Sequence, residues 1–292
     1  MTDIILLDGS MGQELVHRAG DSPTPLWSTQ VMIDHPGMVA SVHADYRKAG
    51  ATVHTTNTYT IHHDRLEGTG QEGQFLELHM AALKEAEGMG VLAGSIGPLI
   101  ASFRPDIHPP YATALPLYAE VANIIAPHVD LILCETVASI DHAKAVLEAA
   151  TATGKPVWLS LTVDDVDGTR LRSGELLTDV LPIAQKAAAI LINCALPEAI
   201  TASMEVLAKG NLPFGAYANG FTKITEAFLQ DKPTVDALTA RQDLDPDAYA
   251  AFAMKWIGQG ATIVGGCCEV GPAHIAKMAE TITAAGHRIV AP

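Results

Sequence analysis

The chain has 292 residues, 48% of them hydrophobic, which is enough for one large α/β domain with a sizeable core. Its net charge is −15 and its pI is about 5.1. This acidic balance argues against a nucleic-acid partner and against an anionic membrane surface, since both favour basic patches. Four cysteines are too few for a disulfide scaffold.

The first residues, "MTDIILLDGS", lack the basic region of a secretion signal, and no apolar stretch is long enough for a membrane helix. The sequence therefore predicts a cytoplasmic protein with reduced thiols. We expect small-molecule substrates as its partners, with no nucleic acid and no membrane. The oligomeric state is left open.

Eight short apolar runs recur along the chain, each followed by turn residues and a longer helical pattern. The runs are residues 4–9, 51–59, 91–98, 131–136, 156–163, 189–194, 213–220 and 261–268. Their hydrophobic residues are continuous rather than alternating, as expected for strands buried on both faces. The helical patterns cover residues 36–49, 72–88, 116–128, 139–153, 176–188, 197–209, 246–259 and 271–285.

This alternation predicts a single (β/α)₈ TIM barrel over residues 1–292, with an open doubly wound sheet as the rival. The pattern at 36–49 begins with Pro and ends before Gly50, an arrangement typical of helices. The Pro-containing segments 18–30 and 99–115 are predicted as loops long enough to take part in function.

Cysteines collect near the carboxyl ends of the predicted strands, where the active site of such a barrel lies. Cys134 alone is explained as a small buried hydrophobic residue, the usual environment of a free cysteine. Cys194, Cys267 and Cys268 together predict a shared site. Three thiolates with one open position are typical of a catalytic zinc centre, but the spacing alone leaves an iron–sulfur or redox role equally open.

Two glycines precede the adjacent cysteines in "IVGGCCEV". Neighbouring side chains of a regular strand point to opposite faces. Both sulfurs can reach one metal only if the backbone bends, and we expect Gly265 and Gly266 to permit that bend. Without metal, we expect the three sulfurs to lie together, or two of them to form a disulfide between the sixth and eighth strands.

Six segments resemble the signature blocks of the homocysteine S-methyltransferase family, in the family's order and over nearly the whole chain. They are "LDGSMGQEL", "TTNTY", "GSIGP", "ETV", "LINCALPEAI" and "GATIVGGCCEVGPAHI". The resemblance implies a barrel that binds Zn²⁺ through the catalytic residues Cys194, Cys267 and Cys268. It also implies methyl transfer to a thiol, usually that of homocysteine, which gives methionine.

The resemblance further implies how the acceptor would be held. Asp8 and Glu135 would bind its ammonium group, and backbone amides of the "DGSMG" turn would bind its carboxylate. The predicted substrate-binding residues are Asp8, Gly9, Ser10, Met11, Asn57, Glu135 and Asn219.

The methyl donor is predicted from charge. An anionic metal–thiolate centre favours a cationic donor, because the reaction neutralises charge in a dry site. Trp27, Tyr59, Trp158 and Tyr217 are candidates for cation–π contact with it. Thr60 stands where betaine-using members tend to carry Tyr, which favours S-methylmethionine or another sulfonium.

Other donors and functions form the alternatives. Betaine is the second choice of donor and methyltetrahydrofolate the third, since one barrel leaves no room for additional folate and cobalamin domains. A metal-binding barrel with hydrolase or redox chemistry, and a non-catalytic binding protein, are the rival functions.

Overall fold

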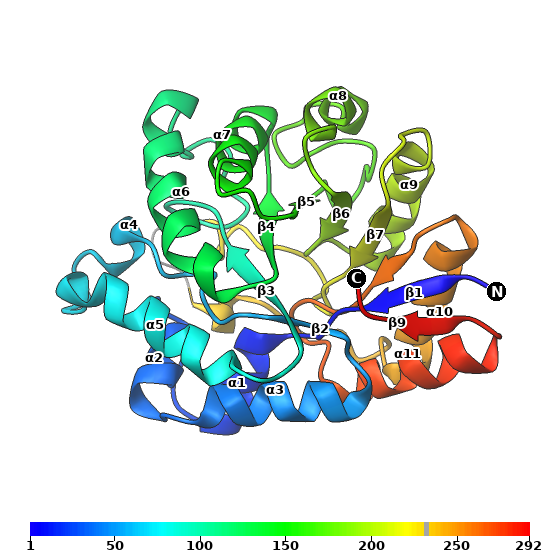
Figure 1. The fold of residues 1–292 in the computed structure, drawn as a ribbon, viewed down its shortest axis with the longest axis horizontal. Coiled ribbons are helices and arrows are strands. Elements are labelled where there is room, and N and C mark those ends of the chain that lie inside the picture. Colours follow the sequence, from blue (N-terminus) through cyan, green and yellow to red (C-terminus); the bar gives the residue numbers. More distant parts are fainter. Residues whose placement is uncertain (231–233) are drawn as a thin grey trace.

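The protein is a closed barrel of parallel strands surrounded by helices in the computed structural model, which describes residues 1–230 and 234–292 (Figure 1). The eight barrel strands in this part of the chain are β1 (Asp3–Leu6), β2 (Val53–Thr55), β3 (Val91–Ile96), β4 (Leu131–Val137), β5 (Val157–Leu161), β6 (Ala189–Asn193), β7 (Phe214–Tyr217) and β8 (Ile263–Val264). They pair in the order β2-β3-β4-β5-β6-β7-β8-β1. A parallel bridge between Leu7 and Val53 joins the end of β1 to β2 and closes the ring. The predicted (β/α)₈ barrel is confirmed.

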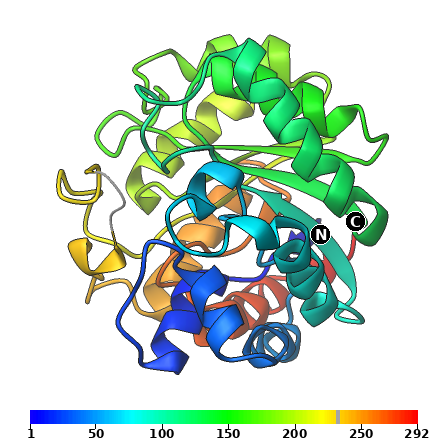
Figure 2. The same ribbon diagram turned by 90° about the vertical axis from the view of Figure 1, so that its left-hand side faces the viewer.

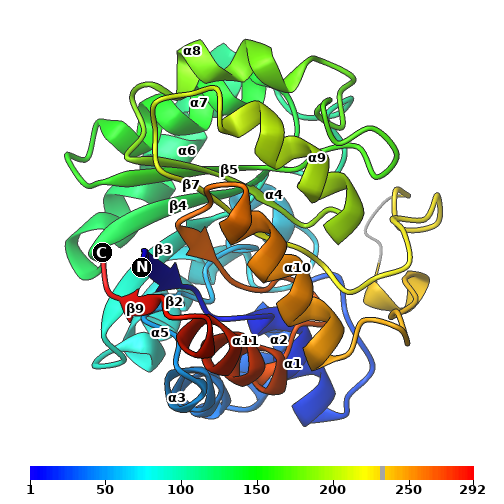
Figure 3. The ribbon, with the colours of Figure 1, turned by 90° about the vertical axis from the view of Figure 1, so that its right-hand side faces the viewer.

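Helices cover the outside of the barrel and are seen from its two ends in Figures 2 and 3. They are α1 (Met11–Ala19), α2 (Ser28–Asp34), α3 (Met38–Ala49), α4 (His63–Leu66), α5 (Phe75–Ala86), α6 (Tyr111–Ile125), α7 (Ile140–Thr151), α8 (Leu181–Ala184), α9 (Pro197–Leu207), α10 (Pro246–Gly258) and α11 (Pro272–Ala284), with 3₁₀ turns at Glu72–Gln74, Ala126–His128, Leu177–Val180 and Val235–Ala237. Among the described residues, no helix is both long and apolar enough to cross a membrane.

One helical prediction and two loop predictions were wrong in extent. The pattern at 176–188 forms only a 3₁₀ turn and the single turn of α8, because the chain turns again after Ala184 to enter β6 at Ala189. The predicted loop 18–30 includes the end of α1 and the start of α2, and the predicted loop 99–115 includes the start of α6. The unpredicted helix α1 is capped by Ser10, whose hydroxyl accepts from the amide of Gln13, and by Gly20, which is in the left-handed conformation.

A ninth strand, β9 (Arg288–Val290), was not predicted. It pairs in parallel with β1, and the Arg288 guanidinium forms an ion pair with Asp3. Since β2 reaches β1 only at Leu7, the first half of β1 has an open edge, which β9 covers. Figure 3 shows β9 beside the N-terminus at the amino end of the barrel, away from the strand ends that form the site.

The barrel interior is filled by a separate cluster of side chains that includes Leu7, Val53, Leu133 and Trp158. Trp158, predicted as a rim aromatic, is 4% exposed and packs in this interior because it lies near the start of β5. It therefore does not belong to the donor site.

Candidate active site

One pocket opens at the carboxyl ends of the barrel strands, the end that faces the viewer in Figure 2. Every residue predicted for the site borders it. These are Asp8, Gly9, Ser10, Met11, Asn57, Glu135, Cys194, Asn219, Cys267 and Cys268. The folding of the barrel thus brings together residues from six separate segments, and their individual roles stay predictions.

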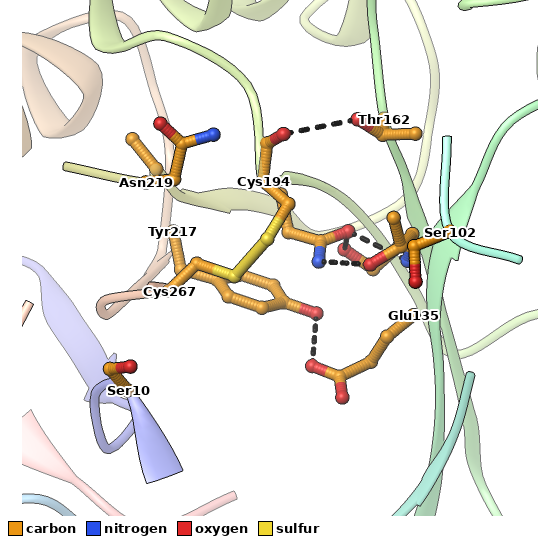
Figure 4. Close-up of a disulfide and its surroundings, with 12 residues drawn as sticks. Ser10, Ser102, Glu135, Thr162, Cys194, Tyr217, Asn219 and Cys267 are labelled. Carbon is orange, nitrogen blue, oxygen red and sulfur yellow. Dashed lines mark hydrogen bonds between the residues drawn. A yellow bond between two sulfur atoms is a disulfide. The ribbon is translucent and has the colours of Figure 1, made fainter. Parts of the chain in front are cut away.

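Three of the four cysteines form one cluster. The sulfurs of Cys194, Cys267 and Cys268 all lie within 4.8 Å of one another. Cys194 and Cys267 are joined by a disulfide between the loops after β6 and β8, with their Cα atoms 5.8 Å apart (Figure 4), and Cys268 is a free thiol. This matches one of the two arrangements expected without metal. Cys134 is instead buried on β4, with its sulfur 4.0 Å from the Val146 carbonyl oxygen of α7.

The turns that carry these cysteines are fixed by close backbone packing. A Cβ atom on Gly265 would lie 2.5 Å from the Cβ of Leu7, and one on Gly266 would lie 2.2 Å from Cγ1 of Val270. The two glycines are therefore required by space, where we had expected conformational freedom. Cys194 has a φ of 51°, a left-handed conformation that is unusual for a non-glycine residue and common at functional sites.

Asp8 is held at the mouth by Thr55. Its two carboxylate oxygens accept from the amide and the hydroxyl of Thr55, both at 2.7 Å. Burial raises the pKa of Asp8 to about 8, although the two hydrogen bonds oppose this rise.

Glu135 is held in a similar way at the end of β4. Its oxygens accept from the Ser95 hydroxyl at 2.5 Å and from the Tyr217 hydroxyl at 2.9 Å, the latter bond drawn in Figure 4. Burial also raises the pKa of Glu135. Since the hydrogen bonds to both carboxyls come from neutral donors, an ammonium ion bound there would favour the ionised form of each.

The "DGSMG" turn is packed against the loop after β8. A Cβ on Gly9 would lie 2.1 Å from the Val270 carbonyl oxygen, which also accepts from the amide of Ser10 at 3.0 Å. The Ser10 amide is thus engaged within the fold. Met11 starts helix α1, and the first amides of a helix have no carbonyl partner in the helix and favour anions.

Asn57 and Asn219 are almost fully buried and bond to neighbouring backbone. The Asn57 amide group donates to the Ser28 carbonyl at 3.3 Å, and the Asn219 side-chain oxygen accepts from the Phe221 amide at 3.1 Å. Both side chains fix the loops that border the pocket, and a direct contact with substrate stays a prediction.

A sequence comparison now decides the family. The profile of the homocysteine S-methyltransferase family matches residues 5–282. The chain belongs to this family. The predicted resemblance is therefore confirmed, and so is the prediction of a methyltransferase.

Two bacterial relatives and one solved structure place this member within the homocysteine S-methyltransferases. The chain is 29% identical to homocysteine S-methyltransferase of Escherichia coli, covering 94% of each chain, and 25% identical to the homocysteine S-methyltransferase YbgG of Bacillus subtilis, covering 94% of this chain and 93% of that one. The metallated form of the E. coli homocysteine methyltransferase MmuM has a TM-score of 0.79 at 26% identity over 96% of both chains, and its oxidized form has a TM-score of 0.80. The similar enzyme thus takes up a metal, and this chain has a cysteine cluster that could hold one.

Sequence reasoning missed several side-chain hydrogen bonds at and near the site. Glu269 accepts from the Gln13 side chain at 2.7 Å, and Gln13 accepts from the Trp27 indole at 2.8 Å. Tyr217 was noted only as an aromatic residue, although its hydroxyl supports Glu135. These contacts join residues far apart in the chain, so no local pattern could reveal them.

Proposed function

We propose that this protein transfers a methyl group from a small onium donor, preferably S-methylmethionine, to the thiol of homocysteine, with zinc held by Cys194, Cys267 and Cys268. The observation that carries the proposal is the convergence of three thiols and two buried carboxyls on one pocket. The names of the relatives support the acceptor.

The cysteine cluster fits a zinc ion. Three sulfurs within 4.8 Å of one another have the ligand type and the compactness of a catalytic zinc site. A zinc ion bound there would keep a thiol substrate deprotonated at neutral pH. Because thiolates and not a disulfide bind metal, the Cys194–Cys267 bond has to be reduced before loading.

The two carboxyls are suited to orient the acceptor. Asp8 and Glu135 come from the ends of β1 and β4 and border the same pocket as the thiols. An amino-acid ammonium bound by them would direct the substrate thiol toward the cysteines. Fixing thiol and methyl group in line can contribute on the order of 7–11 kcal/mol to catalysis in the best cases.

The donor preference follows from the charge and the aromatic lining of the pocket. Trp27, Tyr59 and Tyr217 border it, and two carboxyls make it acidic. In the reaction, the thiol loses its proton and its sulfur bonds to the methyl carbon, while the electron pair of the broken bond stays on the donor. A sulfonium then leaves as a neutral thioether, a better leaving group than the amine released from betaine.

A donor screen tests the proposal. Reduced, zinc-loaded protein is incubated with homocysteine and equal concentrations of S-methylmethionine, betaine or methyltetrahydrofolate, and methionine is measured. We expect turnover with S-methylmethionine above that with betaine, and loss of turnover without zinc. Activity with methyltetrahydrofolate and with no onium compound would contradict the donor assignment. If methionine forms with none of the three donors, the hydrolase, redox or binding alternatives would be favoured.

A further inference from the structure

Arg65, in the short helix α4, is the one basic side chain among the described residues that line the pocket. Its Nη2 lies 3.4 Å from the Pro98 carbonyl oxygen and 3.5 Å from the Ser102 hydroxyl, both at or beyond the long end of hydrogen-bond distances. Its Nε is buried without a hydrogen-bond partner. The guanidinium therefore has donor capacity that the described fold does not use.

The other described arginines are satisfied differently. Six of them form ion pairs with carboxylates, namely Arg18, Arg104, Arg170, Arg172, Arg241 and Arg288. Arg47 donates to a backbone carbonyl at the exposed surface. Arg65 alone combines a buried, unpartnered Nε with weak contacts to neutral acceptors. A buried cationic donor that lacks a hydrogen-bond partner is costly, so its presence at a binding pocket points to an anionic ligand.

The position of Arg65 separates it from the thiols. It contacts Ser102, whose hydroxyl is hydrogen-bonded to that of Tyr59 at 2.9 Å. Figure 4 shows Ser102 well apart from the disulfide, on the side where Glu135 lies. A ligand with its reacting group at the cysteines could thus reach Arg65 with its opposite end.

We propose that Arg65 binds the carboxylate of the methyl donor, so that the donor is a zwitterion with an onium group at one end and a carboxylate at the other. This inference rests on the proposed function. The acceptor carboxylate already has the start of α1, which leaves the guanidinium for the second substrate. A planar guanidinium offers two parallel donors to a carboxylate, which a neutral amide end group cannot match.

The test compares two donors that differ only in this group, S-methylmethionine and its carboxamide. Initial rates are measured with wild type, Arg65→Gln and Arg65→Lys, with the surface variant Arg47→Gln as a control. We expect Arg65→Gln to raise the KM of S-methylmethionine about 10- to 100-fold, as for loss of a charge-assisted hydrogen bond. The carboxamide and homocysteine should keep their KM values, and Arg65→Lys should recover part of the loss. Thermal melting checks that each variant folds.

Three results would overturn the inference. A rise in the KM of homocysteine alone would assign Arg65 to the acceptor. Equal losses with both donors would show a structural role in the Pro98–Ser102 loop, and no change in Arg65→Gln would show that the guanidinium binds no substrate.

Calorimetry separates this inference from the proposed function. Zinc-loaded protein without homocysteine should bind S-methylmethionine more tightly than its carboxamide, and Arg65→Gln should abolish the difference. If that pattern appears in a protein that forms no methionine, the proposed function fails and the Arg65 site stands. If wild type forms methionine and the two donors bind equally, the Arg65 site fails and the function stands. Binding of neither donor overturns both.

Discussion

Among the described residues, two clusters of side chains could hold a metal ion, and they differ in access to the pocket. In each, the ligand atoms lie within 4.8 Å of one another: the sulfurs of Cys194, Cys267 and Cys268 in one, and Asp8, His43 and His54 in the other. The three cysteines border the pocket, whereas neither histidine does. His43 belongs to α3 and His54 to β2, and both side chains are almost fully buried.

The histidine cluster is built to stay neutral. Burial lowers the pKa of His43 to about 3 and that of His54 to about 4. The third member, Asp8, is held by Thr55 and itself borders the pocket. The comparison teaches that short distances between ligand atoms do not define a metal centre. Access for a substrate is also needed, and of these two clusters only the thiols all border the pocket.

The largest expected effect comes from the cysteine cluster. Cys194→Ala, Cys267→Ala and Cys268→Ala should each lose zinc. Their loss of activity should exceed the roughly 10- to 100-fold that is typical when a residue supporting a metal ligand is replaced. Zinc content by atomic emission and methionine formation measure this. Cys134→Ala is the matched control, since this buried cysteine lies outside the cluster and should keep both. A full zinc complement in Cys194→Ala would remove that residue from the centre.

The next largest effect on activity is expected at the two carboxyls of the pocket, Asp8 and Glu135. Asp8→Asn and Glu135→Gln preserve size and remove charge, so each should raise the KM of homocysteine about 10-fold or more, as expected for a charge-assisted bond to ammonium. Zinc content should not change. Loss of zinc in either variant would instead show that this carboxyl supports metal binding by the cysteines.

The strand and helix pattern predicted the barrel because each buried parallel strand carries its own hydrophobic run. Asp8, Glu135 and the three cysteines could be found because strand ends share one rim of such a fold. The strand β9 was missed because its formation depends on the edge of β1 that the short β2 leaves open, and not on a pattern in its own residues.

Side-chain partners were harder to predict than positions. The space requirement at Gly266 depends on Val270 packing, and the Tyr217–Glu135 bond crosses the barrel from β7 to β4. In the segment "HHDR", Arg65 alone reaches the pocket. Local sequence does not show which side chain of such a segment a short helix turns inward.

The smallest effect at neutral pH, and the sharpest test of the comparison, comes from His54. In the unfolded chain its pKa is about 6.5, and in the fold it is about 4. Above pH 6.5 neither state binds the proton, so His54 does not change stability there. Between pH 6.5 and 4 the unfolded state binds more protons, so the free energy of unfolding falls as pH falls.

At 1.36 kcal/mol per pKa unit, this histidine should cost about 2.5 kcal/mol of stability at pH 4.5. His54→Leu introduces an apolar side chain of similar size that cannot bind a proton. In urea unfolding, it should therefore lose less stability than wild type between pH 7 and 4.5. The exposed His128→Gln is the control and should follow wild type. At pH 7, His54→Leu should keep its zinc and its activity. A variant that lost zinc would make the histidine cluster a second metal site, and identical acid sensitivity would mean that His54 is not held neutral by burial.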